Sequence, residues 1–313
     1  MITLLSVFKV LVPMAYLVVW GLYLWLFTAD HPTARRLCSR IALAAVVLHL
    51  GAMAVRGFVL GRLPMGGPLE LSSALALAML MTYLAVEWRL KAKNTGFLIT
   101  GMAFILVFVG NALSTTAPQA SEFLHDPGYA GHAVLVLFSY TALSLSFLFA
   151  VLYLILNRQL MRHQFGLLFQ RLPSLETLER MSVGAVELGV PLLFLSLCLG
   201  HLWMYDLADR MPPEQAAMLS PYDPKILISW VIFLAYTVGL IGFRFLGWRG
   251  RRMNVMAVVA YIVVVATMGL VQHFFPSFHK FRSTESVTSL FIPESEVHES
   301  AGDMLIAAGK DGR

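Results

Sequence analysis

The sequence predicts an all-α, polytopic membrane protein with eight transmembrane helices and both chain termini on the external side of the membrane. Three observations support this fold class: an apolar composition, recurrent apolar segments of spanning length, and positive charge confined to alternate connections. Hydrophobic residues make up 58% of the chain and charged residues 13%, about half the charged fraction of a soluble domain. A soluble globular fold is therefore excluded, and the abundance of apolar residues also excludes a disordered chain.

Eight apolar segments approach or exceed the roughly 20 residues that an α-helix needs to cross the hydrocarbon core. Helices are expected because backbone polar groups in lipid must be satisfied within each segment, and the alternating pattern of a barrel strand is absent. The first segment contains a single charge, Lys9, and no evident cleavage site, so it is interpreted as a spanning helix rather than a signal peptide. The segments cover residues 4–28, 41–61, 69–88, 96–115, 131–157, 182–205, 225–247 and 254–274.

Basic residues cluster in alternate connections, whereas the connections between them are mainly acidic. The positive-inside rule therefore places the basic connections inside and both termini outside. The same distribution explains the net charge of +5 without a nucleic-acid partner. We expect one lipid-embedded domain over 1–281 in the inner (plasma) membrane, followed by an external polar tail over 282–313. The basic clusters lie at 35–40, 89–93, 158–180 and 249–252.

Several polar residues fit helix ends. The inner connection 158–181 is expected to contain a short amphipathic helix over 172–179 at the interface, with Ser174 as its N-cap. Asp223 and Pro224 predict an N-cap followed by proline at the first helical position of the seventh segment. Glu70 is expected to complement the dipole at the start of the third segment.

The histidines are the candidate ligands of the chain. In the predicted topology His132, His201 and His279 lie near the external face, and two neutral imidazoles from different helices can bind a haem iron axially. The alternative is that these terminal histidines hydrogen-bond water in the headgroup layer. His49 lies in the middle of the second segment, where it is either a cofactor ligand or a buried histidine satisfied by a tyrosine or a carbonyl.

The cysteines exclude several kinds of site. Cys38 and Cys198 are the two cysteines, and their separation excludes a disulfide framework, a CxxC redox pair and a CxxCH haem-attachment motif. The sequence also lacks an HExxH motif and a histidine pair at i, i+4. Any cofactor would therefore be held by other residues.

Four stretches in order resemble one known family, the CcsA/HemX family of cytochrome c assembly membrane proteins. Together they cover roughly residues 45–281. The first two are Leu63-Pro64-Met65 with Leu69-Glu70-Leu71-Ser72, and His132 with Ser139-Tyr140 and the run from Leu148 to Leu154. The others are the run from Leu172 to Arg180 with Gly200-His201-Leu202-Trp203, and Asp223-Pro224-Lys225 with Phe278-His279-Lys280-Phe281.

The resemblance implies a role for two histidines and also shows two departures. His132 and His279 stand at the positions of external histidines that ligate haem iron in the family. The family's tryptophan-rich loop, WGxxWxWDPKE, is reduced here to a Tyr-Asp-Pro-Lys segment in which Tyr222 occupies a tryptophan position. Gly242 occupies the position of an intramembrane histidine.

Two functional hypotheses follow. In the first, the chain binds haem transiently at its external face through His132 and His279 and delivers it to a partner, with His201, His49 and Tyr222 as further cofactor-binding candidates. In the second, it is a non-catalytic, HemX-like subunit that stabilises or regulates other membrane proteins of a cytochrome c or haem biogenesis complex. Neither hypothesis assigns a catalytic residue or makes the chain a self-sufficient enzyme; in the first, the partner would contribute the CxxCH thiols that this chain lacks, so haem would be attached to an apocytochrome only with that partner. A small transporter is disfavoured because intramembrane charges are few and paired broken helices are absent.

Overall fold

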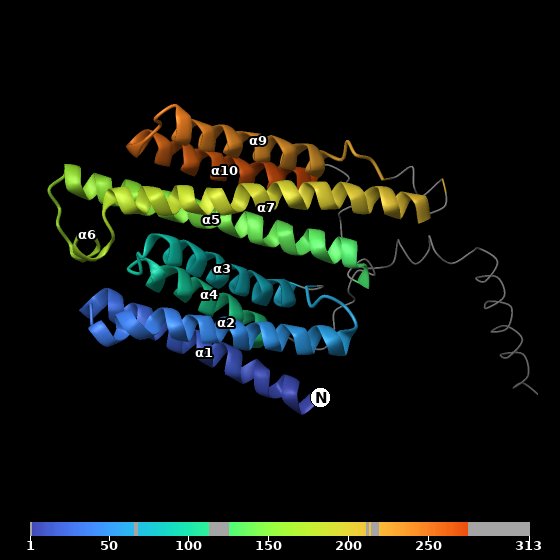
Figure 1. The fold of residues 1–313 in the computed structure, drawn as a ribbon, viewed down its shortest axis with the longest axis horizontal. Helices are drawn as coiled ribbons and strands as arrows, with labels where there is room; N and C mark the ends of the chain where they lie inside the picture. The colour runs from blue at the N-terminus through green and yellow to red at the C-terminus, as the bar shows by residue number, and fades with distance from the viewer. Residues whose placement is uncertain (1, 66–67, 113–124, 211–212, 214–218, 275–313) are drawn as a thin grey trace, which may run out of the picture.

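The structure is a computed structural model that describes residues 2–65, 68–112, 125–210, 213 and 219–274. In these residues the regular elements are all α-helices, which run back and forth along one direction (Figure 1). The central pair α5 and α7 has α1–α4 on one side and α9 and α10 on the other. The helices are α1 (Ile2–Ala29), α2 (Pro32–Leu60), α3 (Pro68–Leu90), α4 (Gly96–Ala112), α5 (Pro127–Met161), α6 (Leu167–Arg171), α7 (Leu175–Arg210), α9 (Pro224–Phe245) and α10 (Gly250–Phe274).

Seven of the described helices are long and apolar enough to cross a membrane. The fourth predicted segment, 96–115, corresponds to α4, whose described apolar part Gly96–Gly110 is shorter than the other seven. The multi-pass helical fold is thus confirmed, while the count of eight and the external position of the termini stay predictions. The tail 282–313 and His279 lie outside the described residues.

The inner connection differs from its prediction. The prediction of a separate amphipathic helix at 172–179 is wrong, because Leu175 already begins α7, and α7 runs unbroken into the spanning segment. Ser174 is nevertheless the cap, since its hydroxyl accepts a hydrogen bond from the Thr177 amide at 3.3 Å. No glycine or proline follows this cap before the apolar run, so nothing ends the helix there. The separate short helix of this connection is α6 instead.

Small residues bring α5 and α7 into close contact. A Cβ atom at Gly189 would lie 3.2 Å from both the Ala142 Cβ and the Ser139 carbonyl oxygen. The Ser146 and Ser182 hydroxyls lie 3.0 Å apart across the same interface. This is how helices associate in lipid, where small residues and hydroxyl bonds replace the hydrophobic effect.

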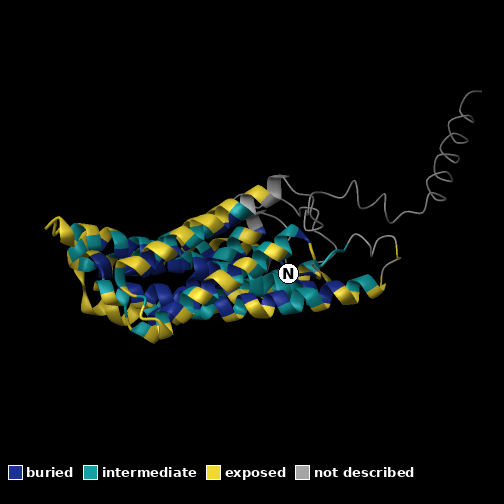
Figure 2. Ribbon diagram, turned by 90° about the horizontal axis from the view of Figure 1, so that it is seen from above, coloured by how far each residue is buried: buried dark blue, intermediate teal, exposed yellow. Residues whose placement is uncertain are grey.

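Apolar side chains also cover the outside of the bundle. Figure 2 shows buried residues inside and many exposed residues along the outer faces of the helices. Among the exposed ones are Val10, Val47, Val231 and Val259, each more than half exposed. A soluble monomer rarely exposes so much apolar surface, so these faces fit a lipid environment.

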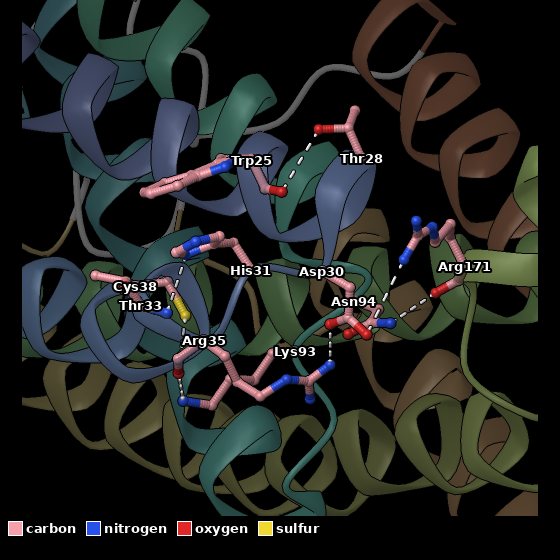
Figure 3. Close-up of polar contacts among 10 residues, drawn as sticks. All are labelled: Trp25, Thr28, Asp30, His31, Thr33, Arg35, Cys38, Lys93, Asn94 and Arg171. Atoms are coloured by element: carbon pink, nitrogen blue, oxygen red, sulfur yellow. Dashed lines mark hydrogen bonds and ion pairs between the residues drawn. The ribbon is translucent and has the colours of Figure 1, made fainter.

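Polar contacts join the helix connections at the arginine-rich end (Figure 3). Asp30, between α1 and α2, forms ion pairs with Arg35 and, at 4.0 Å, with Arg171. The Lys93 ammonium donates to the Arg35 carbonyl at 2.9 Å, and the Asn94 amide donates to the Arg171 carbonyl at 2.7 Å. The hydrogen bond from Arg35 lowers the pKa of the Asp30 carboxyl. Three connections are therefore held together at this end.

Candidate functional site

His132 lies in the first turns of α5, at the end of the bundle opposite the arginine-rich connections. Its Nδ1 is 2.7 Å from the Ser196 carbonyl oxygen of α7. A carbonyl only accepts, so Nδ1 carries the proton and Nε2 carries the lone pair that a metal requires. Gly200 makes room for the ring, because a Cβ at this position would lie 2.7 Å from the His132 Nδ1.

His201 lies directly beside this position on α7. Its Nδ1 is 2.7 Å from the Leu197 carbonyl oxygen, which selects the same tautomer as in His132. The ring makes an edge contact with Trp230 of α9, with 6.0 Å between centroids. In the part of the chain that the structure describes, no hydrogen bond to Nε2 is found for His132 or His201. The fold therefore brings together two half-buried histidines with the same ring nitrogen available.

Two aromatic side chains adjoin His132. Tyr129 and Trp203 are both buried, with ring centroids 5.0 Å apart, and the Tyr129 ring is 6.4 Å from that of His132. Asp126 caps α5 here by accepting from the Gly128 amide at 2.7 Å. This cap is not among the predicted ones, although Asp126-Pro127 has the same pattern as Asp223-Pro224, an aspartate N-cap followed by proline at the first helical position. The cap positions the helix start that carries His132.

The other candidates that were predicted near the external face are not brought to this site in the described residues. Tyr222 is 77% exposed in the turn before α9, where Asp223 caps the helix as predicted by accepting from the Lys225 amide at 2.8 Å. No contact joins Tyr222 to His132 or His201 within the described ranges. His279 lies outside them, so its pairing with His132 stays a prediction.

His49 is held by side chains on both of its ring nitrogens. Nδ1 lies 2.9 Å from the Tyr16 hydroxyl, and Nε2 lies 3.0 Å from the Ser73 hydroxyl. The residue is 2% exposed. The tyrosine partner expected in the structural alternative is therefore present, and ligation of a metal by His49 would require one of these bonds to break.

The position of the family's intramembrane histidine is filled by another side chain. At Gly242 a Cβ atom would overlap the Trp248 ring, which folds back over the end of α9. The Trp248 amide donates to the Gly242 carbonyl at 3.0 Å, and Gly247 between them has a φ of 67°. A histidine at Gly242 would thus require Trp248 to move.

Two carboxylates of the apolar segments form ion pairs with arginines that the sequence did not predict. Glu70 accepts from Arg56 and from Arg62, each with a shortest contact of 2.9 Å. Glu187 pairs with Arg89 at 2.6 Å and with Arg244. All four arginines were visible as charges near segment ends, but their pairing depends on which helices pack together.

Fold and site define a multi-pass helical membrane protein with a histidine pair at one end of its central helices. The chain belongs to the family described as cytochrome C assembly protein, whose pattern matches residues 10–274. This membership supports a role in cytochrome c biogenesis and the resemblance inferred from the motifs.

Three relatives illustrate the family. The chain is 31% identical over 158 residues to protein HemX of Brevibacillus brevis, a match that covers 50% of this chain and 55% of that protein. It is 30% identical over 220 residues to inner membrane protein YpjD of Escherichia coli, covering 70% and 78%. It is 28% identical over 254 residues to cytochrome c biogenesis protein CcsA of Gloeothece citriformis, covering 77% and 70%. The chain thus aligns with about half of the Brevibacillus protein and more than two thirds of the other two.

Proposed function

We propose that this protein handles haem in cytochrome c biogenesis, binding it transiently at the external face of the inner membrane for delivery to a partner. His132 is the proposed first iron ligand, and His279 is the proposed second. The observation that carries the proposal is the hydrogen bond from His132 Nδ1 to the Ser196 carbonyl, which leaves Nε2 as the ligating atom.

The residues around His132 fit such a ligand. A bound haem would supply an iron that the Nε2 atoms of two neutral histidines could ligate. The Ser196 carbonyl fixes the orientation of the His132 ring, and the buried Tyr129–Trp203 pair provides an apolar aromatic wall beside it. His201 is the alternative second ligand, because α7 places it beside His132 with its own Nδ1 committed to a carbonyl.

The second candidate function is a non-catalytic, HemX-like subunit that stabilises or regulates other membrane proteins. Trp248 over Gly242 favours it, since this packing leaves no room for the intramembrane histidine of the family. The exposed Tyr222, at the position of a family tryptophan, favours it as well. In this function the external histidines would keep only their structural hydrogen bonds.

An absorption spectrum of the purified protein separates these functions. After haem-replete expression, we expect a low-spin, bis-imidazole spectrum and haem in a pyridine haemochrome assay. His132→Ala and His279→Ala should each weaken haem retention, and His132→Gly should regain haem when imidazole is added to the solution.

His201→Ala is the matched control, expected to have the smaller effect. A larger loss in His201→Ala than in His279→Ala would reassign the second ligand to His201. Full haem retention in both His132→Ala and His279→Ala would refute the proposed site, and a protein that never acquires haem would favour the subunit function.

A further inference from the structure

A cavity with charged side chains in its otherwise largely apolar wall lies among α1, α2, α3 and the end of α4, away from the histidine pair. Its volume is about 260 Å³, and its wall includes Lys9 of α1, Arg56 of α2 and Glu70 of α3. His49 and Ser73 also line it. Polar side chains inside a membrane protein are costly unless they face water, a ligand or one another, so this cavity is a candidate binding site.

Among the described side chains of the cavity wall and their ion-pair partners, the positive charges outnumber the negative ones. Arg56 and Arg62 both bind Glu70, one to each carboxylate oxygen, so two positive charges share one negative charge. The Arg62 and Glu70 side chains are 5% and 4% exposed. Lys9 and Arg56 belong to the cavity wall, whereas Arg62 is joined to it through its ion pair with Glu70. Excess charge in a region of low dielectric is unfavourable, and a bound anion would offset it.

Arg56 is the residue best placed to bind that anion. Its Nε and Nη2 both donate to Glu70 Oε1, at 3.1 and 2.9 Å. The Nη1 group makes no hydrogen bond in the described part of the chain, and the side chain is 29% exposed and lines the cavity. A guanidinium with a free edge is well suited to a phosphate oxygen.

An apolar groove adjoins the cavity on the other face of α2. It has a volume of about 630 Å³ and shares Met53 and Pro64 with the cavity. Its other lining residues are mostly apolar and come from α2, α3, α5 and the connection 61–65, with Arg62 as the charged exception. They include Leu50, Leu77, Met81, Leu137 and Phe138. A cavity with cationic side chains next to an apolar groove matches a molecule with an anionic head and a hydrocarbon chain.

We propose that the cavity binds the phosphate of an acidic phospholipid through Arg56, and that the lipid's acyl chain lies in the adjoining groove. An acidic headgroup fits better than a zwitterionic one, because the cavity residues already carry more positive than negative charge. This lipid site is independent of haem binding at His132, so either proposal can fail without the other.

Native mass spectrometry of the whole protein can test the site. The protein is released from micelles that contain either phosphatidylglycerol or phosphatidylcholine with the same acyl chains. We expect selective retention of phosphatidylglycerol, and Arg56→Gln should weaken it about tenfold, the loss of one charge-assisted hydrogen bond. Arg36→Gln is the matched control, because it removes the same charge from an exposed position at the other end of α2.

A second variant tests the groove without altering the charges. Ala54 lines the groove from an exposed position on α2, so Ala54→Trp should fill it and reduce phosphatidylglycerol retention while leaving Arg56 in place. Equal retention of the two lipids, or equal effects of Arg56→Gln and Arg36→Gln, would overturn the proposal. Complete displacement of the lipid by inorganic phosphate would also overturn it, since the site would then recognise a soluble anion.

Discussion

The ion pairs of Glu70 allow a quantitative prediction. Glu70→Gln removes the negative charge that Arg56 and Arg62 share but keeps nearly the same side-chain shape. The Arg62 and Glu70 side chains are 5% and 4% exposed, so little solvent is available to replace the lost partner. Removing one partner of a buried ion pair costs about 3–5 kcal/mol, and we expect Glu70→Gln to lower the free energy of unfolding by this amount.

An exposed ion pair of the same type is the control. Glu176 and Arg180 lie 3.0 Å apart on α7 with side chains 74% and 64% exposed, and such i, i+4 pairs contribute about 0.3–0.5 kcal/mol. Unfolding of Glu70→Gln and Glu176→Gln can be followed by circular dichroism as a denaturing detergent is added to the micelles. If Glu70→Gln costs no more than Glu176→Gln, the buried pair does not stabilise the packing of α2 against α3.

Three further predictions follow from helix ends and topology. Asp223→Ala should lower the unfolding free energy by about 1 kcal/mol through loss of the α9 cap, without changing haem binding; loss of function at normal stability would make Asp223 a site residue. Gly242→Ala should cost about 1–3 kcal/mol because its methyl group overlaps the Trp248 ring, and the cost should shrink in a Trp248→Ala background; an equal cost in both backgrounds would contradict this packing. A membrane-impermeant thiol reagent added from outside should label a cysteine at Ser283 and not one at Ser174, whereas the reverse labelling would invert the topology.

Local sequence signals predicted much of the fold correctly. The caps at Ser174 and Asp223 are present, because capping needs only a side chain and the next few amides of its own helix. The apolar segments form helices for a similar reason, because each helix needs only the hydrogen bonds of its own backbone. The separate interfacial helix failed because it required a stop signal after Ser174 that the sequence does not contain.

The candidate site was predictable only in part. The position of His132 near the end of a helix followed from the apolar pattern, and its family role from the ordered motifs. Its tautomer did not, because the Ser196 carbonyl that selects it lies 64 residues away on another helix. The proximity of His201 likewise depends on Gly200 packing against the His132 ring.

The sequence by itself determined the membrane environment, the helical class and the order and approximate position of the apolar segments, because lipid requires every segment to satisfy its own backbone and to present apolar side chains. Tertiary structure alone decided which distant residues come into contact: His49 with Tyr16, Glu70 with two arginines, and the Trp248 ring with Gly242. These contacts depend on the order, rotation and depth at which helices pack against one another. Packing between helices in lipid is set by small residues and a few hydrogen bonds spread over distant segments, which no local pattern in one segment specifies.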